Sequence, residues 1–155
     1  MTTKSGSAHW QGGIKDGKGS ISAQSGALSM TPYGFNQRFE GEPGSNPEEL
    51  IAAAHAACFS MALSKELGEA GVEDPTITTQ AAVKLEQKDG GFAVTRSDLT
   101  VTVRAEGADR AKVEEATQAA KANCPISKLL NADITMDLTV NTQSRPQEEE
   151  PRGAA

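Results

Sequence analysis

The chain has 155 residues, a length typical of one domain, and a formal net charge of −6 at pH 7. An acidic chain without a basic cluster argues against a nucleic-acid partner, and no uninterrupted apolar run approaches the ~20 residues of a membrane span. The first seven residues are polar and lack the apolar core of a signal peptide, so we expect a cytoplasmic protein. Cytoplasmic thiols stay reduced unless catalysis oxidises them. The only two cysteines, Cys58 and Cys124, are therefore candidates for a working redox pair.

The first third of the chain predicts β-structure. Apolar and polar residues alternate around Trp10, the Asp-Gly-Lys-Gly sequence at 16–19 is typical of a turn, and 20–25 is the expected return strand. A proline and a glycine interrupt the segment 28–39. We interpret that segment as a loop with a short strand.

The strongest helical signal starts at Asn46. Asn46 is a good N-cap, Pro47 fits the first helical position, and Glu49 stands where a capping-box glutamate reaches back. Residues 48–70 predict a helix of about six turns, which ends at Gly71 in a left-handed conformation. Because its middle is apolar on nearly all faces, we expect burial all round, by a sheet or by another helix.

The second half of the chain predicts a hairpin and another helix. Residues 76–105 form the hairpin, which turns at the Asp-Gly-Gly sequence 89–91. The apolar phase changes along its second strand, so we expect a bulge or bend between Thr95 and Asp98. A helix over 109–123 follows.

A short helix and a strand close the predicted domain. The helix begins at Pro125, and the strand alternates over 134–140. Helices and strands together indicate one α+β domain over 1–141. Residues 142–155 are polar and include three consecutive glutamates, so we expect a disordered tail.

The two cysteines differ in how their thiolates could be stabilised. A reactive cysteine needs a positive group or a helix N-terminus beside it. Cys58 lies about three turns inside its predicted helix, beyond the reach of the helix dipole, so its cation must come from elsewhere. His55 is one turn away, but Arg38 is the better candidate because a guanidinium stays charged in dry surroundings. Cys124 precedes Pro125 at a helix start and has its own backbone donors. An inert, buried Cys58 is the alternative.

Two motifs carry a resemblance to a known family. Residues 46–59, NPEELIAAAHAACF, closely resemble the signature helix of the OsmC/Ohr family of osmotically induced and organic-hydroperoxide-resistance proteins. Residues 123–128, NCPISK, resemble its second motif, and 9–39 is similar to the OsmC branch in particular. The likeness covers about residues 5 to 141. It implies an OsmC-like fold in which antiparallel sheets wrap around two central helices in an intertwined homodimer with shared active sites.

The resemblance also implies a chemistry. It implies a thiol peroxidase that reduces organic hydroperoxides to alcohols and protects against oxidative stress. It assigns Cys58 as the peroxidatic thiolate and Cys124 as the resolving thiol, which join in a Cys58–Cys124 disulfide. It maps the activating arginine to Arg38 and its carboxylate partner to Glu48. No bound cofactor and no metal are implied, but an external dithiol reductant is, typically a lipoyl-bearing protein.

Helix geometry adds an expectation about the dimer. Glu48 and Cys58 are ten residues apart on one helix, hence about 15 Å along its axis. They cannot share a compact site within one chain. We therefore expect Glu48, with Arg38, to reach Cys58 of the partner subunit in a two-fold dimer, whereas Glu49 is occupied by the helix cap.

Substrate contacts and rival functions stay open. A protein thiol-disulfide oxidoreductase is one rival, although its usual close Cys-x-x-Cys pair is absent. A cysteine hydrolase would need a cysteine, a histidine and an acid in contact, and two cysteines with two histidines have no recognised metal spacing. A non-enzymatic small-molecule binding module is a further rival. Candidates for an apolar substrate pocket, each of which could equally be ordinary core, are Phe35, Phe39, Ile51, Leu129 and Leu130.

Overall fold

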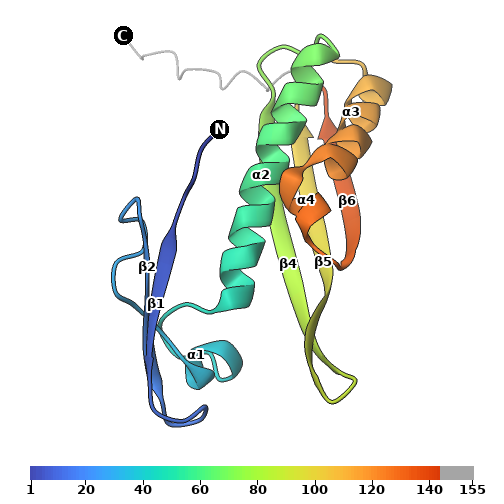
Figure 1. The fold of residues 1–155 in the computed structure, drawn as a ribbon. Helices are drawn as coiled ribbons and strands as arrows, with labels where there is room; N and C mark the ends of the chain where they lie inside the picture. The colour runs from blue at the N-terminus through green and yellow to red at the C-terminus, as the bar shows by residue number, and fades with distance from the viewer. Residues whose placement is uncertain (144–155) are drawn as a thin grey trace, which may run out of the picture.

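Two three-stranded sheets and four helices make up the computed structural model, which describes residues 1–143 (Figure 1). The first sheet holds β1 (Gly6–Gln11), β2 (Lys18–Ala23) and β3 (Thr31–Tyr33). The second holds β4 (Thr76–Lys88), β5 (Gly91–Arg104) and β6 (Asp133–Asn141). The helices are α1 (Phe35–Phe39), α2 (Pro47–Glu69), α3 (Arg110–Asn123) and α4 (Pro125–Leu129). The α+β class is as predicted; residues 144–155 of the expected tail lie outside the described residues.

The N-terminal sheet differs from its prediction in two details. A hydrogen bond from the Gly17 N–H to the Gly13 carbonyl (2.8 Å) closes the turn early, so β2 starts at Lys18 and the predicted return strand over 20–25 was two residues late. The segment after β3 is the helix α1, where a loop was predicted. This helix has only five residues, too few to show a periodic pattern between its flanking breakers.

The long helix α2 begins and ends as predicted. The Asn46 side chain accepts the Glu49 N–H at 2.9 Å, and Pro47 is the first helical residue. The Glu49 carboxylate accepts the Ser45 hydroxyl at 3.4 Å instead of closing a capping box. At the other end Gly71 is left-handed (φ 77°), and the Val72 N–H reaches the Leu67 carbonyl at 2.9 Å in a Schellman motif.

Only one face of α2 is buried in a single chain. Its buried stripe consists of His55, Phe59, Leu63 and Leu67. The expectation of burial all round is wrong for one chain, because the sheet, α3 and α4 cover one side only, and Met61 is 77% exposed. By length and composition α2 could also cross a membrane, although no apolar run in the sequence had seemed long enough. The core helix of a soluble protein meets the same criterion of length and composition.

The hairpin of β4 and β5 is confirmed. Asp89 (φ 53°) and Gly90 (φ 81°) form its two-residue turn. Lys84 pairs with Arg96 but the next residue of β4 pairs with Val94. Thr95 is therefore the extra residue of a bulge, at the start of the segment where a phase change was predicted.

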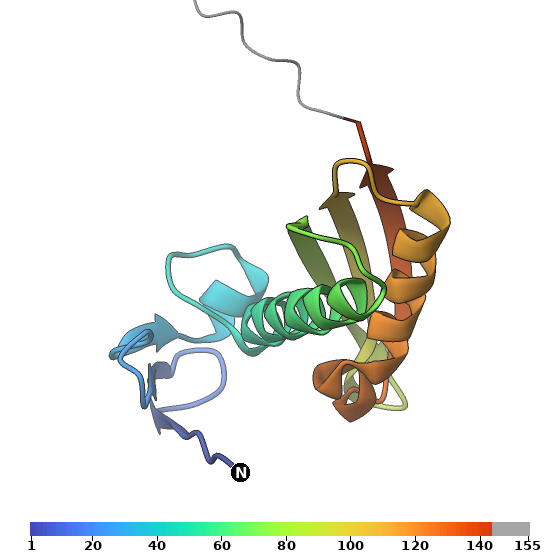
Figure 2. The same ribbon diagram turned by 90° about the horizontal axis from the view of Figure 1, so that it is seen from above.

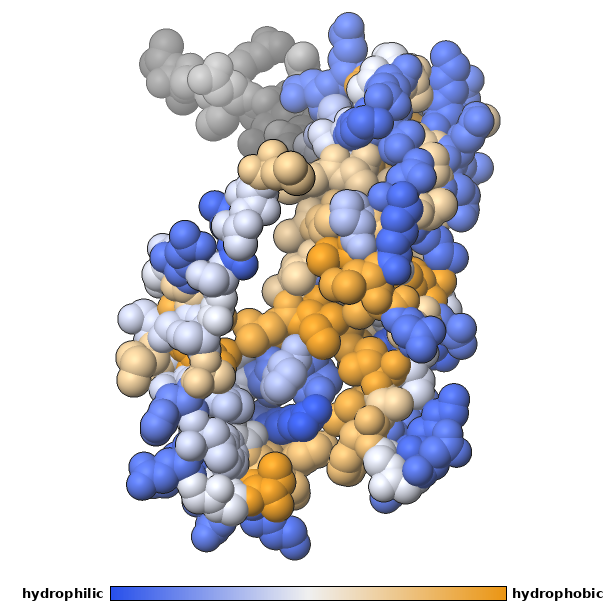
Figure 3. Space-filling model, viewed as in Figure 1, coloured by the Kyte–Doolittle hydropathy of each residue, from blue (hydrophilic) through white to orange (hydrophobic). Residues whose placement is uncertain are grey.

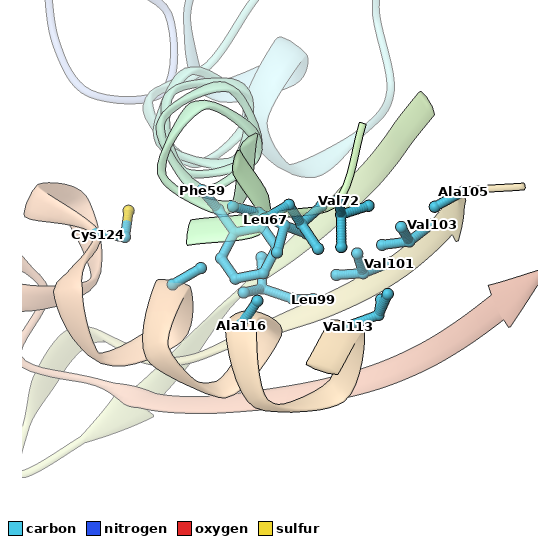
Figure 4. Close-up of a cluster of buried hydrophobic side chains, with 12 residues drawn as sticks. Phe59, Leu67, Val72, Leu99, Val101, Val103, Ala105, Val113, Ala116 and Cys124 are labelled. Carbon is cyan, nitrogen blue, oxygen red and sulfur yellow. The ribbon is translucent and has the colours of Figure 1, made fainter. Parts of the chain in front are cut away.

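The last strand, β6, pairs with β5 in a parallel register. The expectation of purely antiparallel sheets was wrong here, because α3 and α4 carry the chain back along the sheet before β6 starts, which is a crossover connection. The core lies between this sheet and the helices α2 and α3, and Figure 4 shows Cys124 at one edge of it. Its fully buried side chains include Phe59, Leu63, Leu67, Leu99, Val101, Val103 and Val113.

The N-terminal sheet stands apart from this core. Seen from above, it lies on one side of α2, and α3 with the second sheet lies on the other (Figure 2). Every residue of β1 except Trp10 is exposed. Hydrophobic surface gathers over α2 and α4 in the space-filling view (Figure 3). A single chain thus leaves apolar faces of α2 uncovered.

Candidate active site

The fold brings the two cysteines together in one chain. Cys124 ends α3 and precedes α4, and its side chain is fully buried; Cys58 reaches it from α2 and is half-buried. Both thiols are free, each affects the pKa of the other, and the backbone N–H of Ile126 acts on both pKa values. Two neighbouring thiols can exchange between a dithiol and a disulfide if their Cα atoms lie within disulfide distance.

Their surroundings shift the two pKa values in opposite directions. Burial raises the pKa of the Cys58 thiol, and the Ile126 N–H offsets this only in part. Burial also acts to raise the pKa of Cys124, but the Ser127 N–H, the Cys58 side chain and the Ser127 hydroxyl outweigh it, so that this pKa is lowered. Cys124 is thus the more acidic thiol of a single chain, as its helix-start position indicates.

Arg38 and Glu48 form the second half of the predicted site. The guanidinium of Arg38, on α1, donates to both Glu48 carboxylate oxygens, at 3.0 Å from Nε and 2.5 Å from Nη2. Glu48 lies in the first turn of α2, and its hydrogen bond raises the pKa of Arg38. A bidentate ion pair of this kind holds the guanidinium in one orientation.

The two halves are separate within one chain. Cys58 is ten residues beyond Glu48 on the same helix, which is about 15 Å of helix axis. The groups that set the pKa of Cys58 are Ile126 and Cys124, besides burial, and not Arg38. Within residues 1–143 of a single chain, no cation contributes to the pKa of either thiol, and the Arg38 guanidinium is held by Glu48 away from Cys58.

An apolar cavity adjoins the Arg38 end. Its volume is about 300 Å³, and it is lined by Trp10, Ile14, Tyr33, Gly34, Phe35, Arg38, Phe39 and Pro47. Of the five predicted pocket residues, Phe35 and Phe39 line it, with their rings in tilted contact at 4.8 Å between centroids. Ile51 and Leu130 are half-buried elsewhere, and Leu129 is 74% exposed. Trp10 and Tyr33 also line the cavity and were not predicted; their ring centroids lie 5.5 Å apart, so the two side chains meet across β2 from β1 and β3.

His55 has a different environment from the one considered in the sequence. It is fully buried, with Nδ1 2.8 Å from the Ser97 hydroxyl and Nε2 2.9 Å from the Ser127 hydroxyl. Burial lowers its pKa, so the ring is neutral and does not supply a cation to Cys58. Ser127 and Ser97 were missed. The position of Ser127 one helical turn after Cys124 was a usable signal, whereas Ser97 lies far away in the sequence.

Comparison with known proteins identifies the family. The model of the OsmC-like protein family matches residues 39–139. The chain belongs to the OsmC family. It is 56% identical over 134 residues to the peroxiredoxin OsmC of Escherichia coli K12, a match that covers 86% of this chain and 94% of the relative. It is 36% identical over 123 residues to the organic hydroperoxide resistance protein OhrB of Bacillus subtilis, with 77% and 88% covered.

Solved structures agree with this assignment. The crystal structure of Bacillus subtilis OhrB superposes with a TM-score of 0.62 at 32% identity, and covers 87% of this chain and 98% of that one. The predicted OsmC-like fold is thereby confirmed. Within residues 1–143 no group of three or more His, Cys, Asp or Glu side chains comes together that could hold a metal ion. In this member of the OsmC family the candidate site therefore consists of two thiols, an arginine held by a carboxylate, and an aromatic cavity.

Proposed function

We propose that this protein reduces organic hydroperoxides to alcohols, with Cys58 as the peroxidatic and Cys124 as the resolving cysteine. Membership of the OsmC family makes it a cysteine-based peroxidase. The observation that carries the finer assignment is that the two free thiols of one chain lie near enough for each to shift the pKa of the other. The aromatic cavity beside Arg38 suits a substrate with an apolar body and one polar end.

The proposed reaction has two steps in the protein. The Cys58 thiolate attacks the terminal peroxide oxygen, the O–O bond breaks, and the alkoxide leaves as the alcohol after it takes up a proton. Cys58 is then a sulfenic acid. The Cys124 thiolate attacks this sulfur, hydroxide leaves and is protonated to water, and a disulfide forms. An external dithiol, for which a lipoyl-bearing protein is suitable, restores the two thiols by exchange.

Activation of Cys58 requires a second copy of the chain in this proposal. Burial, together with the neighbouring Cys124, raises the pKa of Cys58, which disfavours the attacking thiolate. In a two-fold dimer, Arg38 from one copy would approach Cys58 of the other, with Glu48 fixing the guanidinium. The uncovered apolar surface of α2 and the exposed strand β1 support such an intertwined homodimer. A cytoplasmic location, where thiols are kept reduced, fits the same cycle.

Mass spectrometry of the intact protein tests the proposal. After one equivalent of cumene hydroperoxide we expect loss of two hydrogens per chain, a Cys58–Cys124 peptide link and stoichiometric cumyl alcohol. Two unreacted thiols would refute the peroxidase. Because two thiols in contact also suit protein disulfide exchange, reduction of insulin is measured in parallel, and fast insulin reduction without alcohol would favour that rival.

A further inference from the structure

A buried chain of hydrogen bonds ends one helical turn after Cys124. It starts at Ser97 on β5, passes through His55 on α2, and ends at Ser127 on α4, whose hydroxyl acts to lower the pKa of Cys124. The two hydrogen bonds of His55 are 2.8 and 2.9 Å long. Ser97 and His55 are fully buried, and Ser127 is 9% exposed. Three elements thus meet in one polar network behind the thiol pair.

The direction of these hydrogen bonds follows from the number of protons. A neutral imidazole donates from one ring nitrogen and accepts at the other, and a serine hydroxyl has one hydrogen. A Cys124 thiolate can only accept, so the Ser127 hydroxyl must donate to it. Ser127 then accepts from His55 Nε2–H, and His55 Nδ1 accepts the Ser97 hydroxyl. One tautomer of His55 satisfies every group.

We propose that His55 and Ser97 are positioning residues that orient the Ser127 hydroxyl toward Cys124, so that its thiolate is ready to attack oxidised Cys58. This inference rests on the proposed function, in which Cys124 performs the second step. Ser127 keeps its proton throughout: the Cys124 sulfur forms the S–S bond, the S–O bond of the sulfenic acid breaks, and hydroxide leaves to become water. His55 acts on Cys124 through Ser127 and not directly.

Rapid-mixing kinetics separate the two steps. Ser127→Ala removes the hydroxyl but keeps the backbone N–H, which also acts to lower the pKa of Cys124. After cumene hydroperoxide, we expect Cys58 sulfenic acid, trapped with dimedone, to form at the unchanged rate. Disulfide closure should slow by about tenfold, the factor expected for one lost hydrogen bond to a charged group. Ser127→Thr, which retains a hydroxyl, should restore the rate, and His55→Gln should slow the same step.

A serine outside this network, on α2, provides the control. Ser60 is partly buried; its hydroxyl donates to the Ala56 carbonyl at 2.8 Å and accepts the Thr79 hydroxyl at 2.8 Å. Ser60→Ala should leave both steps unchanged. If Ser60→Ala slows closure as much as Ser127→Ala does, the effect is general loosening and the inference is overturned.

A measurement without peroxide makes the test independent of the proposed function. In the Cys58→Ser protein the ultraviolet absorbance of the thiolate reports the ionisation of Cys124 directly. The substitution removes the titratable thiol next to Cys124, and the remaining titratable group is His55, which is linked to Cys124 through Ser127. Ser127→Ala should raise the midpoint by about one pH unit. An unmoved midpoint together with unchanged closure overturns the inference. Absence of any Cys58 sulfenic acid in the unmodified protein would instead refute the peroxidase.

Discussion

Glu48 and Glu49 are adjacent carboxylates in the first turn of α2, and the structure predicts that only one of them matters for turnover. Glu48 accepts both donors of the Arg38 fork and its side chain is 14% exposed. Glu48→Gln leaves one carbonyl oxygen for two donors and removes the charge. The loss is one charge-assisted hydrogen bond, about 1.5–3 kcal/mol. At 1.36 kcal/mol per factor of ten, kcat/KM for an organic hydroperoxide should fall about ten- to hundredfold.

Glu49→Gln is the matched control. Both substitutions remove one negative charge from the helix N-terminus, so their effects on the helix dipole cancel in the comparison. The cap is kept, because Asn46 accepts the backbone N–H of residue 49 and not its side chain. The carboxylate of Glu49 makes only a long contact of 3.4 Å with Ser45. We expect kcat/KM within about twofold and stability within ~0.5 kcal/mol of the unmodified protein.

The assay follows initial rates of cumene hydroperoxide consumption with a saturating dithiol reductant, across substrate concentrations. The ratio kcat/KM is the informative quantity because it reports the first, peroxide-dependent step. A larger loss for Glu49→Gln than for Glu48→Gln would show that the roles are reversed. Equal, small losses in both variants would refute a function for the Arg38 ion pair.

Three further predictions test the dimer, the buried histidine and the core. Mixing inactive Cys58→Ser with inactive Arg38→Met should restore about a quarter of the activity, because half of the random dimers would carry one intact site built from two chains; no recovery would place Arg38 and Cys58 in one chain. Since burial lowers the pKa of His55, the unfolded chain alone takes up its proton in acid, so the free energy of unfolding should fall as pH drops below ~6.5. Urea titrations should show this slope reduced in His55→Gln. Phe59→Ala should cost about 3–5 kcal/mol in the same titration, since Phe59 is fully buried, and a loss below ~1 kcal/mol would contradict its place in the core.

Local signals made α2 and the hairpin predictable. The cap at Asn46, the glycine after the last turn, and the Asp-Gly turn each act within a few residues of the chain. The helix α1 and the direction of β6 depend on packing between distant segments instead. The intervening α3 and α4 did offer a usable signal, since parallel neighbours require a long crossover.

The candidate site was likewise predictable from the sequence only in part. Helix spacing alone indicated that Glu48 is too far along α2 to reach Cys58 in its own chain, and the structure has the two apart. The sequence could not assign the charge of His55, because that charge depends on burial in the folded chain; its partner Ser97 is 42 residues away. The residues that line the pocket could not be predicted either, because Trp10 is brought to the same cavity as Arg38 only by the folding of the N-terminal sheet.

The start of α4 has a consequence for how easily the enzyme is reset. Pro125 has no N–H, so the first donors of this helix are the N–H groups of Ile126 and Ser127, which act to lower the pKa of Cys124. Their stabilisation favours a thiolate, and a neutral disulfide sulfur accepts such bonds poorly. The reduced form is therefore stabilised by these N–H groups, and the disulfide form is not. That imbalance makes the disulfide more oxidising, so that even a mild dithiol can return the pair to its working state.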